Sequence, residues 1–379
     1  MTSSPGHSPA SGHLSVPASS TSGQSLIPLN MEDLELLHHF ATDTCKTLSD
    51  RTESHDLWRD VAPQIAFEHG YLMRGILAIS ALHLSILRPD QHDRFARVAV
   101  RQQDAALGTF RQMMSHPSHT SGDAFFAMSS LIVVYGFESP KTSNSLGMFD
   151  ARREQSAEWL PLIRGVNLIL QSAWPDIKQG RLNRLLHDHA QPPTSTEIPA
   201  ALAERLVLLE RCNSEAHEHD DDKQACLTAI NRLRQCFIRL YNKTDYECEV
   251  SLAFLWPVVV PQRFIELVFE RRPEALVILA YYCTILHHLD HYWWLNGWGR
   301  HIIGNIRKEL SNDLLEWLEW PARVVGLPLM ATSVNGNVSL GDTSARTHEG
   351  PKLEGRMEQQ ITDLNHDIKE VLNASEPLS

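Results

Sequence analysis

Two short segments combine histidine with acidic residues, which are side chains that bind metal ions in proteins. Residues 217–222 read His-Glu-His-Asp-Asp-Asp in a polar stretch between apolar ones, and this setting favours a solvated connector between helices over a metal site. His287 and His291 stand four residues apart and would share one face of a helix, but no third ligand follows at a suitable spacing. A structural role at a helix C-terminus, where the dipole favours cations, fits them better. The sequence thus predicts no metal and no cofactor.

A helical enzyme of the terpene cyclase kind would need paired carboxylates in a DDxxD or DDxxE box to bind Mg²⁺. Asp220, Asp221 and Asp222 are followed by Lys-Gln-Ala, so the distal carboxylate is missing. The sequence also contains no glycine-rich phosphate loop, no HExxH and no credible nucleophile elbow. We therefore predict no catalytic residues and a protein that is not an enzyme.

The cysteines match a zinc binuclear cluster in number but not in spacing. Such a cluster needs CxxC pairs, because one turn must present two thiolates to a metal. Here the closest two cysteines lie ten residues apart, which predicts small buried hydrophobes in reducing surroundings. The six are Cys45, Cys212, Cys226, Cys236, Cys248 and Cys283.

Around these candidate groups, apolar residues recur at helical spacing, and no segment shows the sustained alternation typical of strands. The sequence predicts an all-α, multi-helix domain over residues 31–328. Residues 1–30 carry no charged residue and are rich in Ser and Pro, which predicts a disordered arm. Residues 329–355 read as a flexible linker, and residues 356–373 as a flexibly attached amphipathic helix.

The spacing also predicts which residues face the core. In the first helix the residues predicted to face inward are Leu34, Leu37, Ala41 and Leu48, with Phe40 beside them. In a short second helix they are Trp58, Val61 and Ile65. In a third helix, from Tyr71 to Leu87, they are Leu72, Ile76, Ile79, Leu82 and Ile86. Residues 124–137 are apolar enough for a central helix, and a polar loop is expected over 139–145. Further helices are expected over 90–114, 159–171, 197–211, 224–241, 263–269, 273–289 and 293–310.

The formal net charge of −12 argues against direct DNA binding by this chain alone, because phosphate binding needs clustered Lys and Arg. The N-terminus lacks the features of a secretory signal, and the apolar stretches look too short and interrupted to span a bilayer. We expect a compartment inside the cell.

The last predicted helix carries a two-heptad apolar stripe, which predicts either self- or partner association or docking on the main body. Its residues are Met357, Ile361, Leu364, Ile368 and Val371.

Several blocks, in order over residues 31–328, resemble the regulatory domain of fungal zinc-cluster transcription factors of the sterol uptake control type. They are Leu36–Phe40 with Thr44, Trp58–Gly70, Leu77–Leu84, Val133–Phe137 with Ser139-Pro140, Trp159–Val166, Arg272–His287, Trp293-Trp294, Gly297-Trp298 and Glu319–Pro321. The N-terminal zinc cluster that usually precedes this domain is absent from the sequence. The extension over 329–379 also departs from the family, whose domain tends to end soon after the Glu-Trp-Pro block.

The resemblance implies a nuclear regulator of transcription, of a fungal metabolic or secondary-metabolite gene cluster, that dimerises with itself or with a zinc-cluster homologue. It also implies an apolar pocket for a sterol or another apolar ligand. A sterol or lipid-binding module without a transcriptional role, or a helical enzyme of secondary metabolism, are the alternatives.

Aromatic residues concentrate between Tyr281 and Trp298, where they form either core or the wall of a ligand pocket. Gly297 would permit a tight bend that turns indole rings towards a cavity. Together with the resemblance, this cluster predicts a ligand site. Its residues are Phe254, Trp256, Tyr281, Leu286, Trp293, Trp294 and Trp298.

Overall fold

The computed structural model describes residues 30–114, 121–142, 159–172, 174–185, 195–216, 219–242 and 249–328. Over these ranges the chain forms helices and short turns, without a strand, so the predicted all-α class is confirmed. Nearly all of the predicted arm, the linker over 329–355 and the helix over 356–373 lie outside the described residues.

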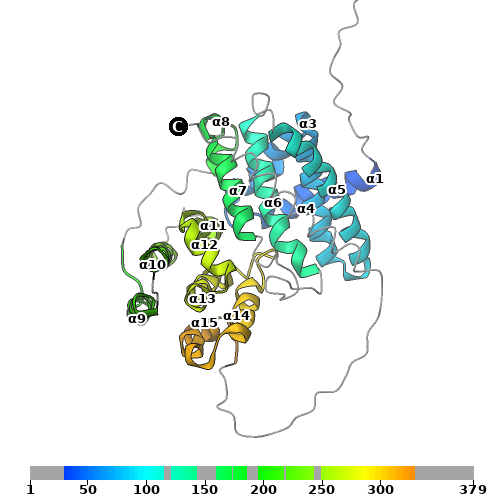
Figure 1. The fold of residues 1–379 in the computed structure, drawn as a ribbon. Helices are drawn as coiled ribbons and strands as arrows, with labels where there is room; N and C mark the ends of the chain where they lie inside the picture. Colours follow the sequence, from blue (N-terminus) through cyan, green and yellow to red (C-terminus); the bar gives the residue numbers. More distant parts are fainter. Residues whose placement is uncertain are drawn as a thin grey trace, which may run out of the picture.

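The helices form two groups, which are apparent in Figure 1. The first group is α1 (Met31–Thr42), α2 (Thr52–Asp56), α3 (Ala62–Glu68), α4 (Gly70–Leu87), α5 (His92–Met114), α6 (Gly122–Thr142), α7 (Trp159–Ser172) and α8 (Trp174–Gln179). The second is α9 (Ala200–Ala216), α10 (Asp220–Tyr241), α11 (Glu249–Val259), α12 (Gln262–Phe269), α13 (Pro273–His288), α14 (Trp298–Glu309) and α15 (Glu319–Val324). Helix α7 packs on both α6 and α11 and so joins the groups.

Helix α4 is the centre of the first group and packs on α1, α3, α5 and α6. Every residue from Tyr71 to Ser85 is buried, as a sequence with apolar residues on all sides requires. Of the five residues of α4 that were predicted to face inward, only Ile86, in the last turn, is exposed, at 37%. In the described ranges α4 is also the one helix long and apolar enough to cross a bilayer, contrary to our expectation, but its burial is that of a core helix.

The inward face of the first helix is rotated relative to the predicted one, although Phe40, and Leu48 beyond the helix, are buried as predicted. Leu34 is 49% exposed, whereas Leu36 and Phe40 are fully buried on a stripe that begins with Asp33. Hydrophobic spacing could not reveal this stripe, because its first member is a carboxylate. Asn30 caps the helix by accepting a hydrogen bond from the Asp33 amide at 2.9 Å, and the Asp33 carboxylate accepts one from the Asn30 amide in return.

Asp33 belongs to a buried polar group that joins three helices. Gln102 of α5 donates to its carboxylate at 2.6 Å, and Arg74 of α4 lies 3.5 Å from it. Arg74 also donates to the Gln102 side-chain oxygen at 2.8 Å, so each member contacts the other two. A buried ion pair is tolerated only when such additional hydrogen bonds satisfy its remaining polar atoms.

In the second group α13 is central, with a continuous run of buried residues from Ala275 to Leu286. Three details differ from the sequence prediction. Asp220, Asp221 and Asp222 form the first turn of α10 rather than a connector, which suits the positive end of the helix dipole. Helix α11 was not predicted, since Pro257 interrupts its pattern. The last long helix begins at Trp298, not Trp293.

The polar loop expected over residues 139–145 also begins later than predicted, because α6 continues to Thr142. Side-chain polarity alone did not mark this boundary, and the residues that follow lie outside the described ranges.

We expect Asp33→Asn to lower the free energy of unfolding by about 3 kcal/mol, because it preserves size and capping but leaves the Arg74 charge without its buried counter-ion. Denaturant titration would measure the loss. Asp60→Asn, which breaks an exposed ion pair with Arg59, is the matched control and should leave the midpoint unchanged. Equal, small effects of both substitutions would contradict the role given to Asp33.

Candidate functional site

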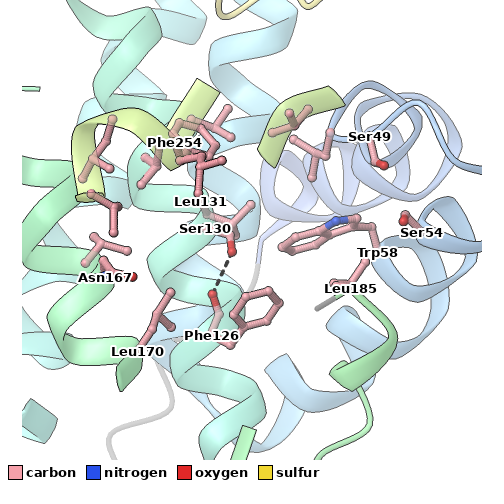
Figure 2. A pocket seen from close by; sticks show the side chains of 18 of the residues that line it. Ser49, Ser54, Trp58, Phe126, Ser130, Leu131, Asn167, Leu170, Leu185 and Phe254 are labelled. Atoms are coloured by element: carbon pink, nitrogen blue, oxygen red, sulfur yellow. Dashed lines mark hydrogen bonds between the residues drawn. The ribbon is translucent and has the colours of Figure 1, made fainter. Parts of the chain in front are cut away.

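A cavity of about 680 Å³ lies between α6, α7, α11 and the segment that follows α1 (Figure 2). This volume falls in the usual range of small-molecule sites. Most of the lining is aliphatic or aromatic. The lining residues are Leu48, Ser49, Ser54, Trp58, Phe126, Ser130, Leu131, Val133, Val134, Ile163, Val166, Asn167, Leu170, Gln171, Trp174, Leu185, Arg239, Val250, Phe254, Leu255, Val258 and Trp294.

The sequence of α6 explains part of the hollow. Its run of large apolar residues is interrupted by Ser130, whose small side chain leaves space beside Phe126 and Leu131. The Ser130 hydroxyl donates to the Phe126 carbonyl at 2.9 Å, so it is satisfied within its own helix. This position therefore contributes volume without demanding a polar partner.

Arg164 of α7 holds the opposite wall. Pro261 has no amide hydrogen, so it cannot donate to the carbonyl of Pro257 at the end of α11. The Arg164 guanidinium donates to this carbonyl at 3.2 Å and to that of Val260 at 2.7 Å. Burial lowers the pKa of Arg164, although these contacts leave it a cation that ties α7 to α11.

Asp123, in the first turn of α6, positions the wall that contains Trp174 and Leu185. Its carboxylate accepts hydrogen bonds from the backbone amides of Arg181 at 2.7 Å and Leu182 at 3.0 Å. A side chain at Gly180 would collide with this carboxylate, so glycine is required for the close approach. The turn after α8 is thus fixed against α6.

Of the seven predicted ligand residues, Phe254 and Trp294 line the cavity. Their rings are stacked, with centroids 6.0 Å apart and an interplanar angle of 10°. Trp294 itself is fully buried. The predicted site therefore touches the cavity at one end only.

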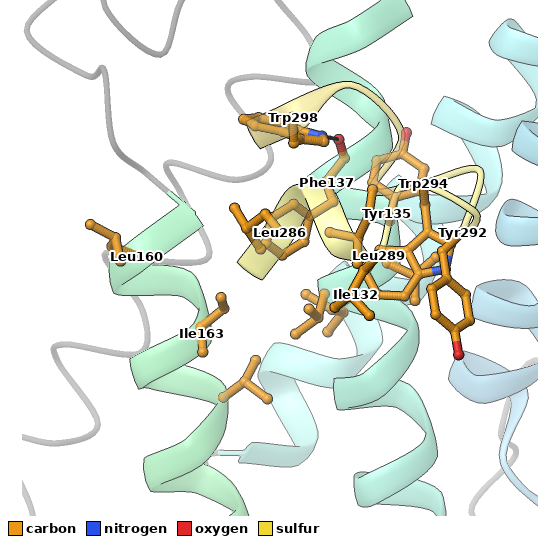
Figure 3. Close-up of a cluster of buried hydrophobic side chains, with 14 of the residues drawn as sticks. Ile132, Tyr135, Phe137, Leu160, Ile163, Leu286, Leu289, Tyr292, Trp294 and Trp298 are labelled. Carbon is orange, nitrogen blue, oxygen red and sulfur yellow. Dashed lines mark hydrogen bonds between the residues drawn. The ribbon is translucent and has the colours of Figure 1, made fainter. Parts of the chain in front are cut away.

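The other five predicted residues lie in the surrounding core. Trp256 stacks on Tyr282 at 4.6 Å and donates its indole hydrogen to the Ala229 carbonyl. Tyr281 stacks on Trp320. Figure 3 shows Leu286 and Trp298 around Phe137, whose carbonyl accepts a 2.7 Å hydrogen bond from the Trp298 indole. Trp293 contacts His83, as described below.

Gly297 forms the expected tight bend, with a φ of 78° that favours glycine. Asp290 stabilises this bend by accepting a hydrogen bond from the Gly297 amide at 3.0 Å. Its other carboxylate oxygen lies 2.6 Å from Nδ1 of His287, so this histidine has a structural contact at the end of α13. Among the described residues, no group of three potential ligands could hold a metal ion.

Sequence reasoning missed the cavity residues of the first group, above all Ser54, Trp58 and Asn167. The only signal in the sequence was a polar residue inside an apolar run, as at Ser130 and Asn167. The sequence prediction places the whole ligand site in the second group of helices, where the aromatic residues are concentrated.

A buried polar cluster next to the cavity joins α1, α4 and the turn before α14. His83 of α4 lies 3.3 Å from His39 Nε2 and 3.1 Å from the Thr44 hydroxyl. Trp293 stacks on His83 at 4.9 Å and donates to the Thr47 hydroxyl at 2.8 Å. Burial lowers the pKa of His83 to about 4, with a further contribution from His39, so His83 is neutral near pH 7.

The chain resembles known regulators of fungal transcription. Residues 35–191 match the family described as the fungal specific transcription factor domain. A Zn(2)-C6 fungal-type transcription factor of Gibberella zeae is 24% identical over 345 residues, covering 87% of this chain and 69% of the relative. The Zn(2)-C6 fungal-type transcription factor afumD of Aspergillus fumigatus is 24% identical, covering 65% of each chain.

Sterol uptake control protein 2 of Saccharomyces cerevisiae is 22% identical over 284 residues, or 71% of this chain but 29% of the relative. These matches confirm the resemblance predicted from the sequence. No family of zinc clusters matches the chain.

We expect stability to fall with pH between about 6.5 and 4 because of His83. Its folded-state pKa is lowered below the unfolded value, so its contribution is complete above pH 6.5 and is lost as pH falls towards 4. The slope attributable to one proton is at most about 1.4 kcal/mol per pH unit. Denaturant titrations across this range should show a shallower slope for His83→Gln. Exposed His38→Gln is the control, and a slope unchanged in His83→Gln would contradict the assignment.

Proposed function

We propose that this chain is a nuclear regulator of transcription whose helical body senses an apolar, sterol-like ligand in the cavity and acts through partner proteins. Its homologues are fungal Zn(2)-C6 transcription factors, and this supports transcription regulation as the general role. The observation that carries the ligand proposal is the partly open, mainly apolar cavity of about 680 Å³. The atoms that line a cavity of this size lack the dispersion contacts that they would make in a filled core. An apolar ligand would supply those contacts.

The cavity lining favours binding over catalysis. Among the described residues that line it there is no carboxylate, histidine or cysteine, so none of these supplies a usual general acid, general base or strong nucleophile to a bound molecule. Elsewhere, burial raises the pKa of the Cys226 and Cys236 thiols to about 12, which keeps both unreactive. The family resemblance agrees with a protein that is not an enzyme.

Partner proteins would supply the contact with DNA. The net charge of −12 and the lack of CxxC pairs argue against specific DNA binding by these residues alone. We propose self-association or pairing with a zinc-cluster homologue, and regulation of a metabolic or secondary-metabolite gene cluster. A lipid-binding module without a transcriptional role is the second candidate, since the cavity alone fits both.

Filling the cavity should abolish ligand binding without unfolding the protein. Val258 lines the cavity from α11, so Val258→Trp would place an indole in the empty volume. In wild type, a sterol at a hundredfold excess over Kd should stabilise the fold by about 2.7 kcal/mol, seen as a rise in Tm. The variant should keep its Tm and lose this rise.

Val207→Trp, on the exposed face of α9, is the control and should respond to sterols like wild type. If no sterol or other polycyclic lipid shifts the Tm of wild type, the ligand proposal fails. Transcript profiling then separates the two candidate functions: a regulator predicts that the deletion and the Val258→Trp allele alter an overlapping gene set, whereas a lipid-binding module does not.

The apolar stripe of the C-terminal segment should drive association. Ending the chain after Gly355 is expected to leave Tm nearly unchanged and to reduce the fraction of dimer in analytical ultracentrifugation, because a short lone helix needs a partner surface. Leu364→Lys should reproduce the effect, whereas His366→Lys, on the opposite face of the predicted helix, should not. A large loss of stability with unchanged dimerisation would instead place the stripe on its own domain.

A further inference from the structure

One end of the cavity carries two polar groups from the helical run that spans α2, a π-helical turn η2 (Leu57–Val61) and α3. Ser54 and Trp58 lie four residues apart and therefore on one face. Each is only 5% exposed. Figure 2 shows the Ser54 oxygen and the nitrogen-bearing edge of Trp58 on the same side of the cavity, near Ser49.

These two groups lack hydrogen-bond partners. Within the described residues, neither the Ser54 hydroxyl nor the Trp58 indole hydrogen makes a hydrogen bond to another group of the protein. The indoles of Trp256, Trp293 and Trp298, by contrast, donate to oxygen atoms of the protein, as a buried tryptophan usually does. Trp58 lies in a π-helical turn, and such turns are frequently found at functional sites.

The far side of the cavity carries a second polar group. Asn167 of α7 lines the cavity well away from Ser54 in Figure 2, and its amide makes no side-chain hydrogen bond within the described part of the chain. Between the two ends the lining consists mainly of Leu131, Phe126 and Phe254, and the nearby Ser130 hydroxyl is already satisfied. The cavity thus has an apolar middle, with Ser54 and Trp58 at one end and Asn167 at the other, and Gln171 and Arg239 are further polar lining residues.

We infer that the cavity takes an elongated apolar molecule with an oxygen at each end: an acceptor oxygen, ketone or hydroxyl, bound by Trp58 and Ser54, and a second oxygen bound by Asn167. The indole is only a donor, which requires an acceptor opposite it, whereas the amide can donate or accept. This inference rests on the proposed function and narrows its ligand class, since a molecule with one oxygen would leave one end of the cavity unpaired.

The test uses four steroids that differ only in oxygen: androstane, its A-ring monoketone, its D-ring monoketone and the diketone. Kd is measured for each against the purified full chain. A neutral hydrogen bond adds about two- to tenfold in affinity, so the diketone should bind about two- to tenfold tighter than the better monoketone. Four equal affinities would overturn the inference while leaving an apolar ligand possible.

Variants locate the two ends. Trp58→Phe keeps an aromatic ring but removes the donor. It should lower the affinity for the diketone and for one monoketone. The affinity for the other monoketone should change no more than the affinity for androstane. Asn167→Leu should weaken the diketone and the opposite monoketone. Ser54→Ala is a milder second variant at the first end, and the hydrocarbon reports changes in shape alone.

Trp317→Phe, outside the cavity, is the matched control and should leave all four affinities unchanged. Loss of affinity for the hydrocarbon equal to that for the ketones in Trp58→Phe and Asn167→Leu would show packing rather than polar recognition, and would overturn the inference. If none of the four binds, the inference and the apolar-ligand proposal both fail.

Discussion

The buried contact between Asp33, Arg74 and Gln102 sets the arrangement on which the cavity depends. It places a charge on α1 against the central helix α4, and any other rotation of α1 would bury that carboxylate away from its partners. With α1 fixed, the chain that follows it runs along the cavity and supplies Leu48, Ser54 and Trp58. A buried ion pair contributes little net stability over an apolar replacement, so its value here lies in selecting one packing of α1.

The remaining walls follow the same principle, in that polar contacts outside the cavity hold apolar surfaces apart. Asp123 fixes the turn after α8, and Arg164 joins α7 to the end of α11 by satisfying carbonyls that proline leaves open. Trp293 closes the cluster around His83 while its neighbour Trp294 faces the cavity. An empty apolar space persists only when the surrounding elements cannot collapse into it, and each of these contacts resists such a collapse.

The fold class and most helices were predictable because apolar spacing dominates them, as in α4, α6 and α13. The errors have physical causes. The inward face of α1 starts with a carboxylate, helix α11 contains a proline, and α14 starts only after a left-handed glycine. The site was half predictable: Phe254 and Trp294 belong to an aromatic concentration visible in the sequence. Ser54, Trp58 and Asn167 meet them only through long-range packing, which local spacing does not encode.

The π-helical turn at Leu57–Val61 makes the cavity lining sensitive to the loss or gain of a single residue in this segment. Such a turn accommodates one residue more than a regular helix would over the same length, and each residue added or removed rotates its neighbours by about 100° around the axis. Losing a single residue here would let the run become a continuous α-helix and would rotate α2, with Ser54, by about 100° relative to α3. Two relatives could therefore share the whole scaffold and diverge in what they recognise through one codon deletion, without any substitution in the cavity itself.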